Sequence, residues 1–177
     1  GPYILYGFSS YIIEVAKLCA KKKIQLNPIS AIITGETINK KQKELIENNL
    51  NTKVFNAYAT NELGWLTQEC EYGNLHINSE YIYMETVNGE GVPVEKGKEG
   101  RIIVTSFDHK IMPFIRYDTG DIGTITEKFC NCGRTLPCVK FIGRKIDIIK
   151  LPSGREVPFL NLLDIFGKYT DFVHQFQ

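Results

Sequence analysis

Apolar residues near the start of the chain recur at helical spacing. From Ser9 or Ser10 onward they stand three or four positions apart, while Glu14, Lys17 and Lys21 take the opposite side. The pattern predicts an amphipathic helix whose buried side carries Tyr11, Ile12, Val15, Leu18 and Cys19.

The next segments predict a strand, a helix and a strand. Residues 29–34 are a short apolar run rich in β-branched side chains. A helix is expected from Asn39 to about residue 49, because Asn39 and Gln42 have the spacing of a capping box. Residues 53–57 then form a second apolar strand. Such a unit of about 30 residues is a βαβ crossover, which predicts parallel strands.

Polar residues follow the carboxyl end of each predicted parallel strand. Gly35 and Glu36 follow the first, and residues 58–62 follow the second. Ligands of open α/β sheets bind at this edge, so the two segments are expected to be neighbours in space.

After Glu62 the pattern changes to short alternating segments separated by Gly/Asn turns such as Asn88-Gly89. Strands are expected at residues 75–78, 81–87, 101–106, 121–126 and 146–151. The predicted fold class is α/β: a βαβ parallel-sheet lobe (1–70), an antiparallel β-barrel-like subdomain (71–142) and the start of a small C-terminal α+β domain (143–177).

Composition and charge exclude several classes of function. With 177 residues and 43% hydrophobic content, the chain can bury a substantial core. A net charge of +1 and the lack of a basic stripe with interleaved aromatics argue against a nucleic-acid partner. No apolar stretch approaches the roughly 20 residues of a membrane span, and no signal segment opens the chain. We therefore expect no membrane span and a cytoplasmic location.

Residues 116–121, with the sequence Arg-Tyr-Asp-Thr-Gly-Asp, combine two carboxylates, a hydroxyl and a glycine that permits a sharp turn. This combination suits the vicinal hydroxyls of a sugar. Asp121, beyond the bend, is expected to accept hydrogen bonds from ribose, and Asp118 is expected to be structural. Arg116 is expected either to contribute to a site or to pair with a carboxylate of the same loop.

Residues 58–62, with the sequence Tyr-Ala-Thr-Asn-Glu, suit a nucleotide phosphate site. Tyr58 can stack on a flat heterocycle, and Thr60 or Asn61 can meet phosphate oxygens. Glu62 is a hard oxygen ligand that suits Mg²⁺ shared with phosphates. The alternative is a strand-to-helix turn with Glu62 in the first helical turn. Further on, the guanidinium of Arg144 has the fork geometry for ribose or phosphate oxygens.

Soft metal ligands form a second group, Cys70, His76, Cys130 and Cys132. Three thiols and an imidazole are the donors that tetrahedral Zn²⁺ prefers. The alternative is buried free thiols with a surface His, and Cys138 is a possible substitute ligand. A Cys/His nucleophilic pair would make the chain a hydrolase or transferase, but the sequence names no third orienting group.

Together, these loops resemble the adenylate-forming superfamily of acyl-CoA ligases, luciferases and peptide-synthetase adenylation domains, and within it the phenylacetate-CoA ligase branch with its capsule-biosynthesis relatives. Residues 58–62 resemble the family's Tyr-Gly-x-Thr-Glu loop, residues 117–121 its Tyr-x-Thr-Gly-Asp loop, and residues 143–147 its Gly-Arg-x-Asp-Asp hinge. Residues 34–36 resemble the segment whose backbone lines the adenine pocket, and residues 130–134 the Cys-x-Cys-Gly-Arg of that branch.

The resemblance implies an ATP-dependent, AMP-forming acyl ligase. It would join a small carboxylic acid to ATP, giving an acyl-adenylate, and pass the acyl group to a thiol such as CoA. By position, Thr60, Asn61 and Glu62 would be catalytic, with Glu62 on Mg²⁺. Gly35, Glu36, Tyr58, Ala59, Asp121 and Arg144 would bind the nucleotide, and the four Cys/His ligands would hold a structural zinc.

Three positions depart from the family pattern. Ala59 replaces the customary Gly, Asn61 stands where Thr or Ser is usual, and Ile146 leaves Asp147 as the only hinge acid. The family's phosphate loop and catalytic lysine are not found in these residues. We therefore expect a fragment whose partners include the remaining N- and C-terminal parts of the same enzyme. The alternative is a non-catalytic nucleotide-binding or zinc-stabilised interaction domain.

Overall fold

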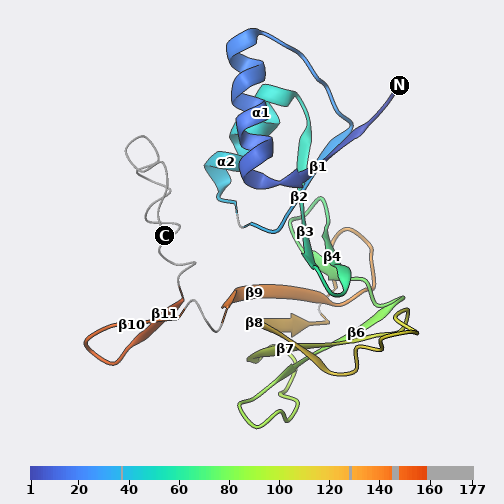
Figure 1. The fold of residues 1–177 in the computed structure, drawn as a ribbon, viewed down its shortest axis with the longest axis vertical. Coiled ribbons are helices and arrows are strands. Elements are labelled where there is room, and N and C mark those ends of the chain that lie inside the picture. Colours follow the sequence, from blue (N-terminus) through green and yellow to red (C-terminus); the bar gives the residue numbers. More distant parts are fainter. Residues whose placement is uncertain (37, 128, 145–147, 159–177) are drawn as a thin grey trace. The chain divides into compact units, whose positions relative to one another are not determined.

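The computed structural model describes residues 1–36, 38–127, 129–144 and 148–158, which form two compact units (Figure 1). Unit 1 comprises Gly1–Asn78 and Phe129–Arg134, and unit 2 comprises Ser79–Lys128 and Thr135–Gln177. These units follow the contacts within the chain. The expected domain bounds at residues 70 and 142 remain predictions.

Unit 1 is a mixed sheet with two helices. Strands β1, β2 and β3 are mutually parallel, and β3, β4 and β5 are antiparallel. The elements, in chain order, are β1 (Ile4–Phe8), α1 (Ser9–Lys22), β2 (Ser30–Thr34), α2 (Lys40–Leu50), β3 (Lys53–Thr60), β4 (Gly64–Glu69) and β5 (Leu75–Ile77). The βαβ unit expected from the sequence is confirmed, and β1 adds a second crossover before it.

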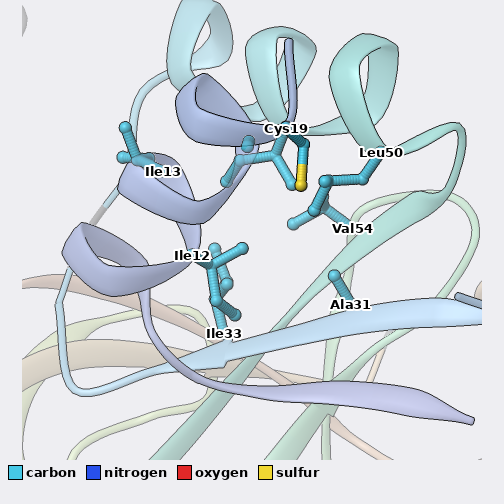
Figure 2. Close-up of a cluster of buried hydrophobic side chains, with 9 residues drawn as sticks. Ile12, Ile13, Cys19, Ala31, Ile33, Leu50 and Val54 are labelled. Atoms are coloured by element: carbon cyan, nitrogen blue, oxygen red, sulfur yellow. The ribbon is translucent and has the colours of Figure 1, made fainter. Parts of the chain in front are cut away.

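The core of unit 1 lies between the helices and the parallel strands. Figure 2 shows this cluster of buried side chains, which come from α1, α2, β2 and β3. Each buried Ile, Leu or Val of such a cluster contributes about 1.5–3 kcal/mol through removal of its apolar surface from water. The cluster contains Ile12, Ile13, Ala16, Cys19, Ala31, Ile33, Ile46, Leu50 and Val54.

Helix α1 forms where the sequence predicts it, but the face that it buries differs from the predicted one. Ile12 and Cys19 are buried as expected, whereas Tyr11, Val15 and Leu18 are exposed. The expectation was wrong for these three side chains because the buried stripe continues through Ile13 and Ala16 instead. Small Ala16, which is fully buried, lets the helix lie close to the sheet.

Helix α2 begins with the predicted capping box. The Asn39 side chain accepts a hydrogen bond from the Gln42 amide at 2.9 Å, and the Gln42 side chain accepts from the Asn39 amide at 3.0 Å. These bonds satisfy two backbone donors that a helix N-terminus otherwise leaves unpaired.

Unit 2 is an antiparallel sheet with the strand order β6-β7-β8-β9. Its strands are β6 (Ile82–Val87), β7 (Glu99–Ser106), β8 (Tyr117–Thr126) and β9 (Cys138–Arg144). Strands β10 (Ile148–Lys150) and β11 (Glu156–Pro158) form a separate hairpin. Among the described residues the main sheet is open, because β6 ends the strand order and does not pair with β9. The predicted fold class is confirmed, with an open sheet in place of a closed barrel.

The structure contains strands that the sequence did not predict, and some predicted strands are longer than expected. Strands β1, β4, β9 and β11 have no counterpart in the prediction. Strand β8 begins at Tyr117, so residues 117–121 lie within a strand rather than in a loop before it. Gly120 still has the positive φ, 74°, that the predicted bend requires. Residues 145–147 of the expected hinge lie outside the described residues.

Candidate functional site

Two segments predicted to bind a ligand, residues 34–36 and 58–62, lie at the carboxyl ends of the neighbouring parallel strands β2 and β3. Strands β2 and β3 are parallel, with Ile33 opposite Asn56. Two residues further along this register come Gly35 and Tyr58. The expectation that these two segments are neighbours is therefore supported by the register.

Gly35 is required by two separate constraints. Its φ of 76° lies in the left-handed region, where a side chain is strained. A Cβ at this position would also lie 2.6 Å from Cδ1 of Phe8. The Phe8 ring thus packs directly against the backbone at the end of β2, and no other residue type fits there without movement.

Glu36 binds the N-terminus of helix α1. Its carboxylate accepts hydrogen bonds from the Ser9 hydroxyl at 2.7 Å, from the Ser10 amide at 2.8 Å and from the Ser10 hydroxyl at 3.0 Å. Burial by itself would raise the pKa of Glu36, but these hydrogen bonds lower it below its ordinary value of 4.5. The Glu36 side chain therefore caps helix α1. If this segment contacts a ligand, it does so through the backbone of residues 34–35 and not through the Glu36 carboxylate.

Tyr58, Ala59 and Thr60 lie in β3, and residues 61–63 form the turn to β4. The Tyr58 amide donates to the Thr67 hydroxyl at 3.3 Å, and the Leu63 amide donates to the Thr60 hydroxyl at 3.1 Å. Asn61 and Glu62 are exposed in this turn. The alternative of a helix beginning here is wrong, because a hairpin follows β3.

In unit 2 the structure brings Asp121 and Arg144 together. Nε of Arg144 donates to the Asp121 carboxylate at 3.1 Å, across the paired strands β8 and β9. The Asp121 side chain is 7% exposed and that of Arg144 is 65% exposed. The predicted ribose acceptor and the predicted hinge arginine are thus direct partners, although they stand 23 positions apart.

The neighbouring charges have structural partners. Asp118 pairs with Arg101 and accepts the Gly120 amide at 3.0 Å, which confirms its expected structural role. Nε of Arg116 donates to Glu85 at 2.9 Å rather than to a carboxylate of its own segment. The expectation of a pair within the same loop was wrong because β6, which carries Glu85, is brought close by the sheet.

The four predicted metal ligands form one cluster within unit 1. The ligand atoms of Cys70, His76, Cys130 and Cys132 all lie within 4.8 Å of one another. The sulfurs of Cys70 and Cys130 are 3.7 Å apart, and the sulfur of Cys132 is 3.3 Å from Nε2 of His76. Two thiolates on one tetrahedral zinc, each about 2.3 Å from it, lie about 3.8 Å apart, so these donors fit the ion. Cys138 is not in the cluster.

Tight turns present these ligands. The Cys70 amide bonds to the Asn74 carbonyl at 2.9 Å, and the Gly133 amide bonds to the Cys130 carbonyl at 3.0 Å. Gly73 and Gly133 occupy the left-handed region within the two turns, with φ of 76° and 80°. The alternative of buried thiols with a surface His is wrong for His76, which is 2% exposed.

Polar groups next to the cluster stabilise the thiolate forms of Cys70 and Cys132. Burial raises the pKa of the Cys70 and Cys132 thiols, but hydrogen bonds from nearby backbone amides and polar side chains lower it below its ordinary value. The Cys132 backbone amide lowers the pKa of Cys130, but burial and the neighbouring thiols raise it above its ordinary value. Asn74 also donates to the sulfur of Cys130 at 3.3 Å. Two thiols therefore ionise more readily than the third.

The sequence reasoning overlooked two polar residues around the cluster. Asn74 contacts a ligand sulfur, and Glu69 is a buried carboxylate directly before Cys70. The available signal for Glu69 was a charged residue at the end of β4, a strand whose other residues are all uncharged.

Among the described residues, neither helix is long and apolar enough to cross a membrane.

Comparison with known proteins gives one curated relative, and no family model matches the sequence. The chain is 28% identical to phenylacetate-coenzyme A ligase from Thermus thermophilus, over 98% of this chain and 42% of the ligase. The chain therefore spans less than half the length of that relative.

Solved structures of several ligases and synthetases share the fold. A 2-hydroxyisobutyryl-CoA ligase in complex with 2-HIB-AMP and CoA superposes with a TM-score of 0.79 and 22% identity, over 94% of this chain and 41% of that one. The amide bond synthetase McbA from Marinactinospora thermotolerans gives 0.69 and 14%, over 96% and 37%. The anthranilate CoA ligase AuaEII in complex with anthranoyl-AMP gives 0.65 and 15%, over 88% and 32%.

Proposed function

We propose that this chain, a homologue of phenylacetate-coenzyme A ligase with the fold of the adenylate-forming CoA ligases, is the part of an AMP-forming acyl ligase that holds the adenosine portion of ATP. The reaction joins a small carboxylic acid to the α-phosphate of ATP and releases pyrophosphate. A thiol such as that of CoA then attacks the acyl carbon, forming a thioester and releasing AMP. The observation that carries the proposal is the contact between Asp121 and Arg144.

Asp121 suits the ribose hydroxyls for a physical reason. Its carboxylate is nearly buried in the sheet, where a charged acceptor forms stronger hydrogen bonds than in water. The largely exposed guanidinium of Arg144 balances that charge and can shift toward a nucleotide without leaving the carboxylate.

In unit 1, the resemblance of residues 34–36 and 58–62 to the family's nucleotide loops supports assigning contacts with adenine to the backbone of Gly35 and the ring of Tyr58. An aromatic ring and a backbone without a side chain are flat surfaces that suit a purine. Thr60 and Asn61 are assigned to phosphate oxygens. Glu62 is assigned to Mg²⁺, which offsets the repulsion between the attacking carboxylate and the α-phosphate as charge builds.

For the Cys/His cluster we propose a structural zinc. Three thiolates and a neutral imidazole around a divalent cation carry one net negative charge. Arg134 offsets it, because its side chain hydrogen-bonds to Cys132 and this bond raises the pKa of the guanidinium. A reducing compartment such as the cytoplasm keeps the three thiols available for the metal.

The nucleotide assignment is tested by binding, because a chain that spans less than half of its relative is proposed to show little or no adenylation alone. AMP affinity is measured calorimetrically for the chain, for Asp121→Asn and for Asp118→Asn as a matched control. Asp121→Asn is expected to weaken AMP binding about 10-fold or more, since a hydrogen bond to a charged group contributes about 1.5–3 kcal/mol. Equal losses in both variants would refute the assignment.

The fragment assignment is tested by carboxylate-dependent pyrophosphate exchange. Exchange is expected to be absent or feeble for these 177 residues. Turnover comparable to that of an intact ligase would contradict the fragment assignment while leaving the ligase reaction itself in place.

A further inference from the structure

A buried carboxylate, Glu69, links the Cys/His cluster to strand β3. It is the last residue of β4 and directly precedes the ligand Cys70. Its side chain is 7% exposed, so its charge requires partners within the fold. The nucleotide and metal assignments above give it no role.

The partners of Glu69 lie on β3 and α2. Its Oε2 accepts the Asn56 backbone amide at 2.5 Å and the Asn56 side-chain amide at 2.8 Å. Nζ of Lys43, on α2, lies 3.1 Å from Oε1 and 3.3 Å from Oε2. One carboxylate thus binds the backbone of β3, a side chain of β3 and a lysine of the helix.

Glu69 acts where the backbone ladder stops. The pairing of β3 with β4 runs as far as Ala57 opposite Gln68. The Asn56 amide has no strand partner on that side, and the Glu69 side chain accepts its hydrogen. At Asn56, β3 is therefore paired with β2 on one side and held by the Glu69 side chain in place of a β4 backbone partner. Tyr58 lies two residues further along the same strand.

The metal cluster, in turn, governs where Glu69 is held. Cys70 is the next residue, and the turn from Cys70 to Asn74 packs against the carboxylate, since a Cβ on Gly73 would lie 3.7 Å from Oε1 of Glu69. A metal that fixes Cys70 and His76 fixes one end of this turn and the strand β5 that follows it. Without the metal, the turn keeps its own hydrogen bonds and the pairing of β4 with β5, but its cross-link to Cys130 and Cys132 is lost.

We propose that Glu69 is a positioning residue that couples the metal site to the strand carrying Tyr58. The inference rests on the zinc assignment and deepens the proposed nucleotide site. A metal bound at the cluster fixes the turn from Cys70 to Asn74, and the turn fixes the position of the Glu69 carboxylate. That carboxylate binds the Asn56 amide, which lies two residues before Tyr58 in β3. A simple helix-to-sheet ion pair would need only Lys43, whereas here two groups of Asn56 converge on one oxygen.

The test is amide hydrogen exchange of the zinc-loaded and zinc-free chain, with zinc content measured by elemental analysis. Removing zinc is expected to speed exchange at Asn56 and Tyr58 by about 10-fold or more, while amides of helix α1 serve as the internal reference for global unfolding. Glu69→Gln keeps all four metal ligands and is expected to bind zinc one to one. Its exchange at Asn56 is expected to be fast with or without the metal.

Glu71→Gln is the matched control. Glu71 stands on the other side of Cys70, but its side chain is 59% exposed and pairs with Arg134 at 3.5 Å. This variant is expected to keep the full zinc-dependent protection of Asn56. A charge effect on the metal alone would appear in both variants, and it would overturn the positioning role.

The outcomes separate this inference from the assignments it rests on. If zinc binds one to one and its removal leaves exchange at Asn56 and Tyr58 unchanged, the coupling is refuted and the zinc assignment stands. Retention of zinc-dependent protection in Glu69→Gln would refute it equally. A chain that binds no zinc would overturn both the zinc assignment and the coupling, while AMP binding would still report on the nucleotide site.

Discussion

The Cys/His cluster and the Asp121–Arg144 pair are both built from residues far apart in the chain, but they differ in their contact with water. Three of the four cluster ligands are buried, whereas the Arg144 side chain is 65% exposed. Buried donors with one fixed geometry suit a permanent ligand that adds to stability. An ion pair with one exposed partner can exchange with a ligand at little cost. The comparison separates the proposed structural metal centre from the proposed nucleotide site.

The largest effect is expected from the buried centre. Cys132→Ser removes the most accessible thiolate of the cluster and should weaken zinc binding by at least about 100-fold, since even residues around a metal site commonly contribute 10–100-fold. Zinc affinity is measured by competition with a chromogenic chelator. Cys138→Ser, outside the cluster, is the matched control and should bind zinc like the original chain. A loss shared by Cys138→Ser would place Cys138 among the ligands.

An intermediate effect is expected from the exposed pair. Arg144→Gln should weaken AMP binding about 3- to 10-fold, because the carboxylate loses the partner that orients it. The free energy of unfolding should change by less than about 1 kcal/mol, since the guanidinium is largely solvated. Calorimetric titration and urea denaturation measure the two quantities. A large loss of stability with unchanged AMP affinity would make the pair structural, like the cluster, and remove the contrast.

The smallest effect concerns Glu36, whose pKa is lowered by hydrogen bonds from Ser9 and Ser10. A carboxyl group with a lowered folded-state pKa contributes stability above its ordinary value of 4.5, and this contribution is lost as the pH falls through the folded-state pKa. The chain should therefore lose stability on acidification below about pH 4.5 slightly more than Glu36→Gln does, by well under about 1 kcal/mol because the group is mostly exposed. Urea denaturation at neutral and acid pH measures the difference. An identical acid dependence in both chains would show that Glu36 is not a stabilising cap.

Local sequence features predicted the elements whose causes are local. The capping box at Asn39 and Gln42 placed the start of α2, and the β-branched run placed β2. The cap and the strand depend on residues within a few positions of one another, so the sequence displays them directly. The four donors of the Cys/His cluster were named from their residue types and the Cys-x-Cys turn, although Cys70 and Cys130 stand 60 positions apart.

Other features depend on which surfaces meet, and the sequence was a poor guide to them. The buried face of α1 was assigned wrongly for Tyr11, Val15 and Leu18, because apolar periodicity alone does not say which neighbouring stripe packs on the sheet. Arg116 binds Glu85, on another strand, rather than a carboxylate close in sequence. The role of Glu69 was invisible because its partners are 13 and 26 positions away.

The sequence by itself determined the chemical inventory of this protein: the thiols and imidazole of a candidate metal site, the aspartate with its glycine bend, and the strand-helix-strand alternation that makes a parallel sheet. Tertiary structure alone decided that Arg144 donates a hydrogen bond to Asp121 and that Glu69 accepts one from the Asn56 amide. The physical reason is range. Caps, turns and periodicity act within a few residues, whereas the pairing of buried charges is settled only when strands and helices close on one another.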